Sequence, residues 1–135
     1  MNTSCENIAR QFYDVFNTGN VDILDNLLAD DWADRPALPG IPPGREGEKS
    51  AVKGFRQAFP DVRFVLDDVI VAEDKVTVRS TVHGTHKGEF LGVEPTNRSV
   101  TFTTIDIHRI ANNQIVETWH LEDFYGLLQQ LNAAQ

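Results

Sequence analysis

Apolar residues recur at two different spacings along the chain, and the first spacing is helical. Apolar side chains within residues 8–16 recur every three or four positions, which predicts a helix. Residues 21–28 repeat the pattern over a shorter stretch and predict a second helix that ends near residues 30–31. A third helix is predicted over residues 48–59, because Val52, Phe55 and Phe59 lie on one side of it and Pro60 ends it.

A proline-rich segment separates the second and third predicted helices. Residues 35–47 hold four of the six prolines and three of the nine glycines. Proline lacks an amide donor and fixes φ, so this composition cannot sustain a helix or a central strand. We expect a long surface loop, or a loop that acts as a lid, directly after Trp32.

After Pro60 the apolar spacing changes from helical to alternating, and β-branched residues dominate to about residue 123. The pattern predicts two hairpins with an irregular connection over residues 84–97, and then a short last helix. The predicted strands are residues 62–72, 75–86, 98–111 and 114–123, and the last helix is residues 124–132.

The order of these elements predicts an α+β fold in one domain, residues 1–135. Three helices followed by an antiparallel meander bury their apolar faces when the helices pack against one face of the sheet. The chain contains no internal repeat, low-complexity segment or linker.

Composition and charge restrict the possible partners. The net charge of −8 and the scattered basic residues argue against nucleic acid. No apolar run approaches the roughly 20 residues that a membrane span needs, so we expect no membrane partner. The first residues lack the basic and apolar regions of a secretory signal, and we expect a cytoplasmic protein. The single Cys5 excludes an internal disulfide.

The second hairpin carries the residues that could support chemistry. If Asn112 and Asn113 form a two-residue turn, His108 lies opposite Glu117, Asp106 opposite Trp119, and Phe102 opposite Asp123. These side chains would then share one face.

Two interpretations of this face are open. The opposite face carries Ile105 and Ile107, which is typical of a core and would leave the acidic face in water. Against this, Trp119, Phe102 and Leu121 share the acidic face, and such a mixture suits a ligand pocket. Desolvation there would raise the pKa of a carboxyl group toward the range in which proton transfer next to a carbonyl is efficient.

Several segments resemble the SnoaL-like polyketide cyclases. Gly84-Thr85-His86-Lys87-Gly88-Glu89-Phe90-Leu91-Gly92-Val93-Glu94-Pro95-Thr96 is similar to the family's G-T-H-x-G-x-F-x-G-x-x-P-T segment. Ile105-Asp106-Ile107-His108-Arg109-Ile110 and Gln114-Ile115-Val116-Glu117-Thr118-Trp119, with Asp123 and Leu127-Leu128-Gln129-Gln130-Leu131, are similar to its C-terminal half. Phe59-Pro60-Asp61-Val62-Arg63-Phe64 fits its passage from third helix to first strand.

The resemblance implies the cone of nuclear transport factor 2, in which a strongly curved antiparallel sheet encloses helices and a pocket, usually in homodimers or higher oligomers. It also implies an intramolecular aldol ring closure of a polyketide ester, with neither metal nor cofactor. In the family an aspartate near the last helix is the acid and base, which corresponds to Asp123 here. His108 matches an assisting histidine. Asp106 matches a pocket acid of the related ketosteroid isomerases.

Other residues are candidates for substrate contact. Phe16 and Trp32 are aromatic residues of the helical half that could touch a ligand, and His86 belongs to the irregular connection. Arg35 stands where relatives often have a histidine, and it could attract an anionic substrate. His83 and His86 are three apart beside a strand and point to opposite faces, so we expect no metal site.

Three functions remain open. The first is a cyclase or isomerase in which Asp123 removes a proton next to a carbonyl of a small apolar or aromatic compound, while His108 or Asp106 stabilises the enolate. The second is a non-catalytic module that binds a small apolar ligand. The third is a domain that serves mainly for dimerisation.

Overall fold

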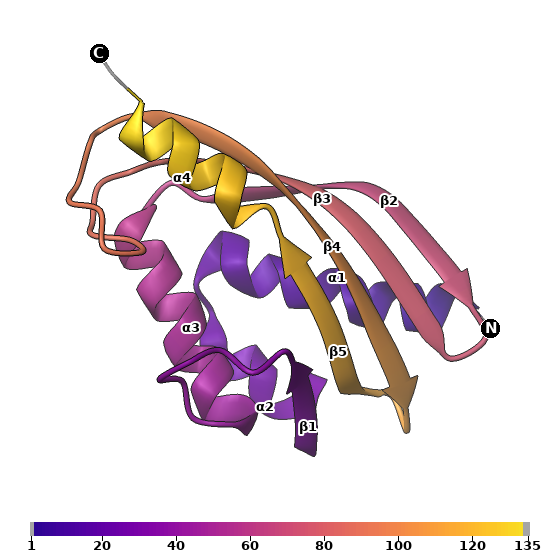
Figure 1. Ribbon diagram of the computed structural model, residues 1–135. Helices are drawn as coiled ribbons and strands as arrows, with labels where there is room; N and C mark the ends of the chain where they lie inside the picture. The colour runs from indigo at the N-terminus through magenta and orange to yellow at the C-terminus, as the bar shows by residue number, and fades with distance from the viewer. Residues whose placement is uncertain (1, 134–135) are drawn as a thin grey trace.

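The computed structural model describes residues 2–133, in which one curved sheet packs against helices on its inner face (Figure 1). The prediction of one domain includes residues 1, 134 and 135, which lie outside the described residues. The elements in chain order are α1 (Asn2–Thr18), the 3₁₀ turn η1 (Val21–Ile23), α2 (Leu24–Leu27), β1 (Leu28–Arg35), α3 (Gly44–Ala58), β2 (Arg63–Ala72), β3 (Lys75–Thr85), β4 (Ser99–Ala111), β5 (Gln114–Glu122) and α4 (Phe124–Asn132).

The sheet has the strand order β1-β5-β4-β3-β2, and the predicted α+β fold is confirmed. Strands β2 to β5 pair antiparallel with their neighbours, whereas β1 pairs parallel with β5. The sheet is therefore mixed rather than purely antiparallel. Strand β1 was not predicted, because Asp30, Asp31 and Asp34 interrupt the apolar alternation by which a strand is recognised.

Helix α3 begins at Gly44, four residues before the predicted start. Pro42 and Pro43 therefore precede the helix rather than interrupt it, and the loop shortens to residues 36–43. This loop lies close against α3, because a Cβ atom on Gly47 would come within 1.6 Å of the carbonyl oxygen of Pro42. Only glycine permits that approach.

The turn between β4 and β5 has the predicted residues but not the predicted register. Asn112 and Asn113 have φ values of 53° and 62°, as a tight hairpin turn requires. The pairs Ala111–Gln114 and Ile110–Ile115 follow, but the next pair joins Arg109 to Glu117, so β5 holds one extra residue, Val116. This bulge moves every later side chain of β5 to the opposite face from the one predicted.

Two apolar clusters fix the helices on the sheet. The larger joins α1, α2 and Trp32 to the inner face of β3, and the smaller joins the end of α3 and α4 to β3 and β4. The connection of residues 86–98 lies across the end of α3, where the amides of Lys87 and Gly88 both donate to the carbonyl of Ala58. Among the described residues, no helix is long and apolar enough to span a membrane.

Candidate active site

A cavity of about 430 Å³ lies between the inner face of the sheet, helices α1 and α3, and the loop of residues 36–43. Its size is within the usual range for small-ligand pockets. Seven of the eight phenylalanines line it, so a large part of its wall is aromatic. They are Phe12, Phe16, Phe55, Phe64, Phe90, Phe102 and Phe124, and they are the most frequent residue type in the wall.

Two neighbouring strands supply a polar strip to this cavity. Strand β4 contributes Thr104 and Asp106, and β5 contributes Thr118, His120 and Glu122. Since side chains of a strand alternate between faces, the cross-strand pairs Thr104–Glu122 and Asp106–His120 both point inward. Asp106 and His108 are both buried on the inner face, so the solvated interpretation is wrong for these two residues.

A chain of hydrogen bonds crosses the core to Asp106. The indole Nε1 of Trp32 donates to Oγ1 of Thr118 (3.1 Å), and that hydroxyl lies 2.9 Å from Nδ1 of His108. Nε2 of His108 lies 2.8 Å from the hydroxyl of Tyr13, which donates to Oδ2 of Asp106 at 2.6 Å. The chain joins α1, β1, β4 and β5 behind the cavity.

The protonation states along this chain follow from the environment. Burial, followed by the charge of His120, lowers the pKa of His108 to about 3, so its imidazole is neutral. When Asp106 is ionised, the hydroxyl of Tyr13 donates its hydrogen bond to the carboxylate, so its oxygen must accept a hydrogen bond from Nε2–H of His108. Nδ1 of His108 then accepts from Thr118, and every member has its partner.

Asp106 has the properties of a proton acceptor at neutral pH. Its side chain is 5% exposed, and desolvation raises its pKa from 3.8 to about 7. The hydrogen bond from Tyr13 opposes the shift because it stabilises the ionised form, and the negative charge of Glu122 adds to the shift. A carboxyl group with such a pKa can accept and return a proton.

His120 is an imidazolium held between two carboxylates. Nδ1 lies 2.7 Å from Oε1 of Glu122, while Nε2 lies 2.8 Å from the carbonyl oxygen of Pro36 and 3.4 Å from Oδ1 of Asp34. Desolvation lowers the pKa of His120, but the bonds to Asp34 and Glu122 outweigh it and raise the value to about 11. This ion triad ties the start of the loop to β5.

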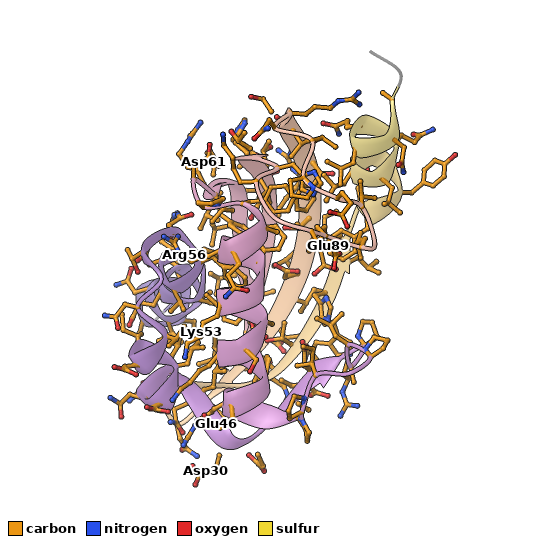
Figure 2. The ribbon with its side chains drawn as sticks, turned by 90° about the vertical axis from the view of Figure 1, so that its left-hand side faces the viewer. Asp30, Glu46, Lys53, Arg56, Asp61 and Glu89 are labelled. Carbon is orange, nitrogen blue, oxygen red and sulfur yellow. The ribbon has the colours of Figure 1, made fainter. Side chains whose placement is uncertain are left out.

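Two further acidic residues line the cavity. Glu48 of α3 is buried, and desolvation, with the charge of Asp34 added, raises its pKa well above the ordinary value. Glu89 is exposed in the connection of residues 86–98, beside the upper end of α3 (Figure 2). Beyond the acids of the sheet, the cavity thus has Glu48 inside its wall and Glu89 at its rim.

Three predicted site residues do not share the inner face. Asp123 is exposed and caps α4, where its Oδ1 accepts the amide of Gly126 at 2.9 Å. Trp119 lies on the outer face opposite Ile107, and Leu121 is 74% exposed there. The predicted grouping of Asp123 and Trp119 with Asp106 is wrong, because the Val116 bulge reverses β5.

The remaining predicted residues fall in different places. Phe16 and Phe102 line the cavity. Trp32 is buried beside a second cavity of about 310 Å³, under the loop of residues 36–43. Arg35 is exposed and pairs with Glu117, away from the cavity lining. His86 is buried outside it, where its Nδ1 accepts the amide of Thr96 at 3.1 Å.

Sequence reasoning missed Tyr13, Glu48 and the ion triad of His120. For Glu48 a signal existed, since it lies one turn before Val52 on the apolar side of α3. His120 was missed because the bulge could not be seen in the alternation. Among the described residues, no group of three or more His, Cys, Asp and Glu side chains is arranged to hold a metal ion.

Comparisons with known proteins agree with this architecture. The family model for SnoaL-like polyketide cyclases matches residues 6–131. The nogalonic acid methyl ester cyclase of Streptomyces nogalater is 29% identical over 119 residues, covering 86% of this chain and 88% of that enzyme. The structure of TsrD from Streptomyces laurentii superposes with a TM-score of 0.90 at 28% identity, covering 99% of this chain and 98% of TsrD. IdmH from Streptomyces antibioticus gives 0.82 at 30% identity, covering 96% and 99%.

Proposed function

The chain belongs to the SnoaL-like polyketide cyclase family, and on that premise we propose that it closes a ring in a small, mostly apolar carbonyl compound by acid and base catalysis. The nogalonic acid methyl ester cyclase that it resembles suggests an aromatic polyketide ester as the substrate class. Asp106 is the proposed proton acceptor and donor, in place of Asp123.

One observation carries this proposal: a buried carboxyl group with a pKa near neutrality lines an aromatic cavity. Tyr13 occupies Oδ2 of Asp106, and no hydrogen bond joins Oδ1 to another described residue. Asp123, in contrast, is exposed and engaged in capping a helix. A group that must exchange a proton with substrate has to face the cavity.

Asp106 alone can carry out both proton transfers of the proposed ring closure. The carboxylate removes a proton from the carbon next to a carbonyl, and the electron pair of that C–H bond forms an enolate. The enolate carbon attacks a second carbonyl of the same molecule, which makes the ring bond and leaves an alkoxide. Asp106 returns its proton to the alkoxide and is ionised again.

The other residues of the site position the reacting groups. Tyr13 holds Oδ2 of Asp106, and the neutral His108 holds Tyr13, so both are positioning residues. The aromatic walls keep the substrate folded, with its reacting carbons together. Proton transfer contributes about 10²–10⁴-fold to the rate, and positioning supplies the larger remainder.

The experiment replaces Asp106 with Asn and uses nogalonic acid methyl ester as the first substrate. Asn keeps the bond from Tyr13 but cannot accept a proton, so kcat should fall by about 10²–10⁴-fold while substrate affinity stays within a few-fold. The control variant Asp123→Asn should retain turnover. If Asp106→Asn turns over at the wild-type rate, the proposal is wrong. Binding without turnover by the wild-type protein would favour the non-catalytic module instead.

We also propose that the protein forms a homodimer through the outer face of β4 and β5. Ile105 is 51% exposed and pairs across the strands with Leu121, which is 74% exposed. Ile107 and Trp119 extend the same apolar patch. A patch of this kind on a sheet face is typical of an association surface.

The dimer is tested by sedimentation equilibrium of the wild-type protein and of Leu121→Asp. We expect a dimer for the wild type and a folded monomer for the variant. A wild-type monomer at concentrations of about 100 μM would contradict the proposed dimer, since an obligate dimer binds far more tightly than that.

A further inference from the structure

Of the acids that line the cavity, only Glu48 makes no hydrogen bond or ion pair with another described residue. Its side chain is 7% exposed, and the causes of its raised pKa are burial and the charges of other side chains rather than a hydrogen bond. Asp106, Asp34 and Glu122, in contrast, each bond to a neighbour. Burying a carboxyl group without a partner costs free energy, so its place in the wall requires a reason.

Glu48 also lies where two cavities meet. It lines both the main cavity and the second cavity of about 310 Å³ under the loop of residues 36–43. Asp34, Leu38 and Ile41 are the other residues shared by the two cavities. A ligand that extends from one cavity toward the other therefore passes the carboxyl group of Glu48.

The surroundings of Glu48 affect its protonation. Asp34, Asp106 and Glu122 act on it with negative charge, and the imidazolium of His120 opposes them with positive charge. The charge of His120 is already balanced by two of these carboxylates. Burial and these carboxylates raise the pKa of Glu48 and so favour its neutral form, whose hydroxyl can donate one hydrogen bond.

We propose that Glu48, as a neutral carboxylic acid, donates a hydrogen bond to an uncharged carbonyl oxygen of the bound substrate. The inference deepens the proposed function, on which it rests for the presence of a carbonyl substrate. It also assigns the substrate class: a ketone or ester oxygen can accept this bond, whereas a carboxylate would meet the negative charge of Asp34, Asp106 and Glu122.

The proposal predicts opposite results when each of the two acids is replaced by its amide, Asp106 by Asn and Glu48 by Gln. Asp106 must ionise to act, so its amide variant should be inactive. Glu48 must stay neutral and donate, and the amide of Gln is neutral, similar in size and also a donor. Glu48→Gln should therefore retain binding of a carbonyl compound, and Glu48→Leu, which has no donor, should weaken it.

The test measures binding, so that it is independent of turnover. The probes are 2-acetylnaphthalene, which has a carbonyl oxygen, 2-ethylnaphthalene, which has the same shape without it, and 2-naphthoate, which is anionic. Isothermal titration calorimetry gives Kd for the wild-type protein, Glu48→Gln and Glu48→Leu. Glu46→Gln is the matched control, because Glu46 lies on the same helix but exposed on its outer face (Figure 2).

We expect Glu48→Leu to raise the Kd for 2-acetylnaphthalene by about tenfold, which corresponds to one lost hydrogen bond. The Kd for 2-ethylnaphthalene should stay within about threefold of the wild-type value. Glu48→Gln and Glu46→Gln should bind both probes as the wild type does, and 2-naphthoate should bind weakly throughout. A raised thermal midpoint of unfolding for Glu48→Leu would show that the weaker binding does not come from a loss of folded protein.

Either of two results overturns the proposal. One is unchanged ketone binding in Glu48→Leu; the other is a loss in Glu48→Gln as large as in Glu48→Leu. Failure of the proposed function is seen separately, because Asp106→Asn would then turn over normally whatever the ketone binding shows.

Discussion

Replacing Tyr13 with Phe removes the single hydroxyl that stabilises the ionised form of Asp106. The O–H···O bond of 2.6 Å lowers the pKa of Asp106, which desolvation has raised to about 7. A hydrogen bond to a charged group contributes about 1.5–3 kcal/mol, which corresponds to about 1–2 pKa units. The pKa of Asp106 in Tyr13→Phe should therefore rise to about 8–9.

The expected result is a displaced pH profile. As a base, Asp106 acts only when ionised, so the acid limb of kcat/KM should move from near pH 7 to about pH 8–9 in Tyr13→Phe. At pH 7 the ionised fraction falls from about half to roughly 1–10%, and the rate should fall by about 5–50-fold and recover as the pH rises.

The assay is a pH profile of ring closure between pH 5 and pH 10, fitted for the limiting pKa in each variant. Tyr125→Phe is the matched control, because Tyr125 is 75% exposed on α4 and away from the cavity lining. An acid limb of Tyr13→Phe that coincides with that of the wild type, or lies at lower pH, would refute the role assigned to this hydrogen bond.

Three further predictions concern stability. The folded pKa of Asp106, about 7, exceeds its ordinary 3.8, so stability falls as pH rises from about 4 to about 7. Asp106→Asn should therefore unfold at a midpoint higher than the wild type by roughly 5–15 °C at pH 8, and the two midpoints should converge at pH 4. The raised pKa of His120, about 11 against 6.5, stabilises the fold fully below pH 6.5, and calorimetry should show this stabilisation lost as pH rises toward 11 in the wild type but not in His120→Gln. Gly47→Ala should lower the thermal midpoint, because its Cβ atom would displace the loop at Pro42; an unchanged midpoint would contradict the packing described.

The sequence predicted most elements because their signals are local. The helical spacing of α1 and α4 and the turn at Asn112-Asn113 each depend on a few neighbouring residues, and each is confirmed. The family resemblance is confirmed as well. Strand β1 was missed because its aspartates interrupt the local apolar alternation and its pairing partner, β5, is far away in the chain.

The site was predicted only in part, and one residue explains most of the difference. Alternation placed Asp106 and His108 together, and they do face inward. The position of the β5 side chains depended on an unbroken register, and the extra residue Val116 reversed it. Nothing in local spacing reveals such a bulge, so Trp119 was placed in the cavity.

The state of Asp106 is the claim on which the mechanism depends most directly. Carbon-13 NMR of the wild-type protein, labelled at aspartate side-chain carboxyl carbons and assigned with Asp106→Asn, measures its titration without any substrate. A midpoint near pH 7 is expected from the burial of Asp106 against Tyr13. A midpoint near pH 4 would mean that the carboxyl group is in contact with water, which would contradict the account.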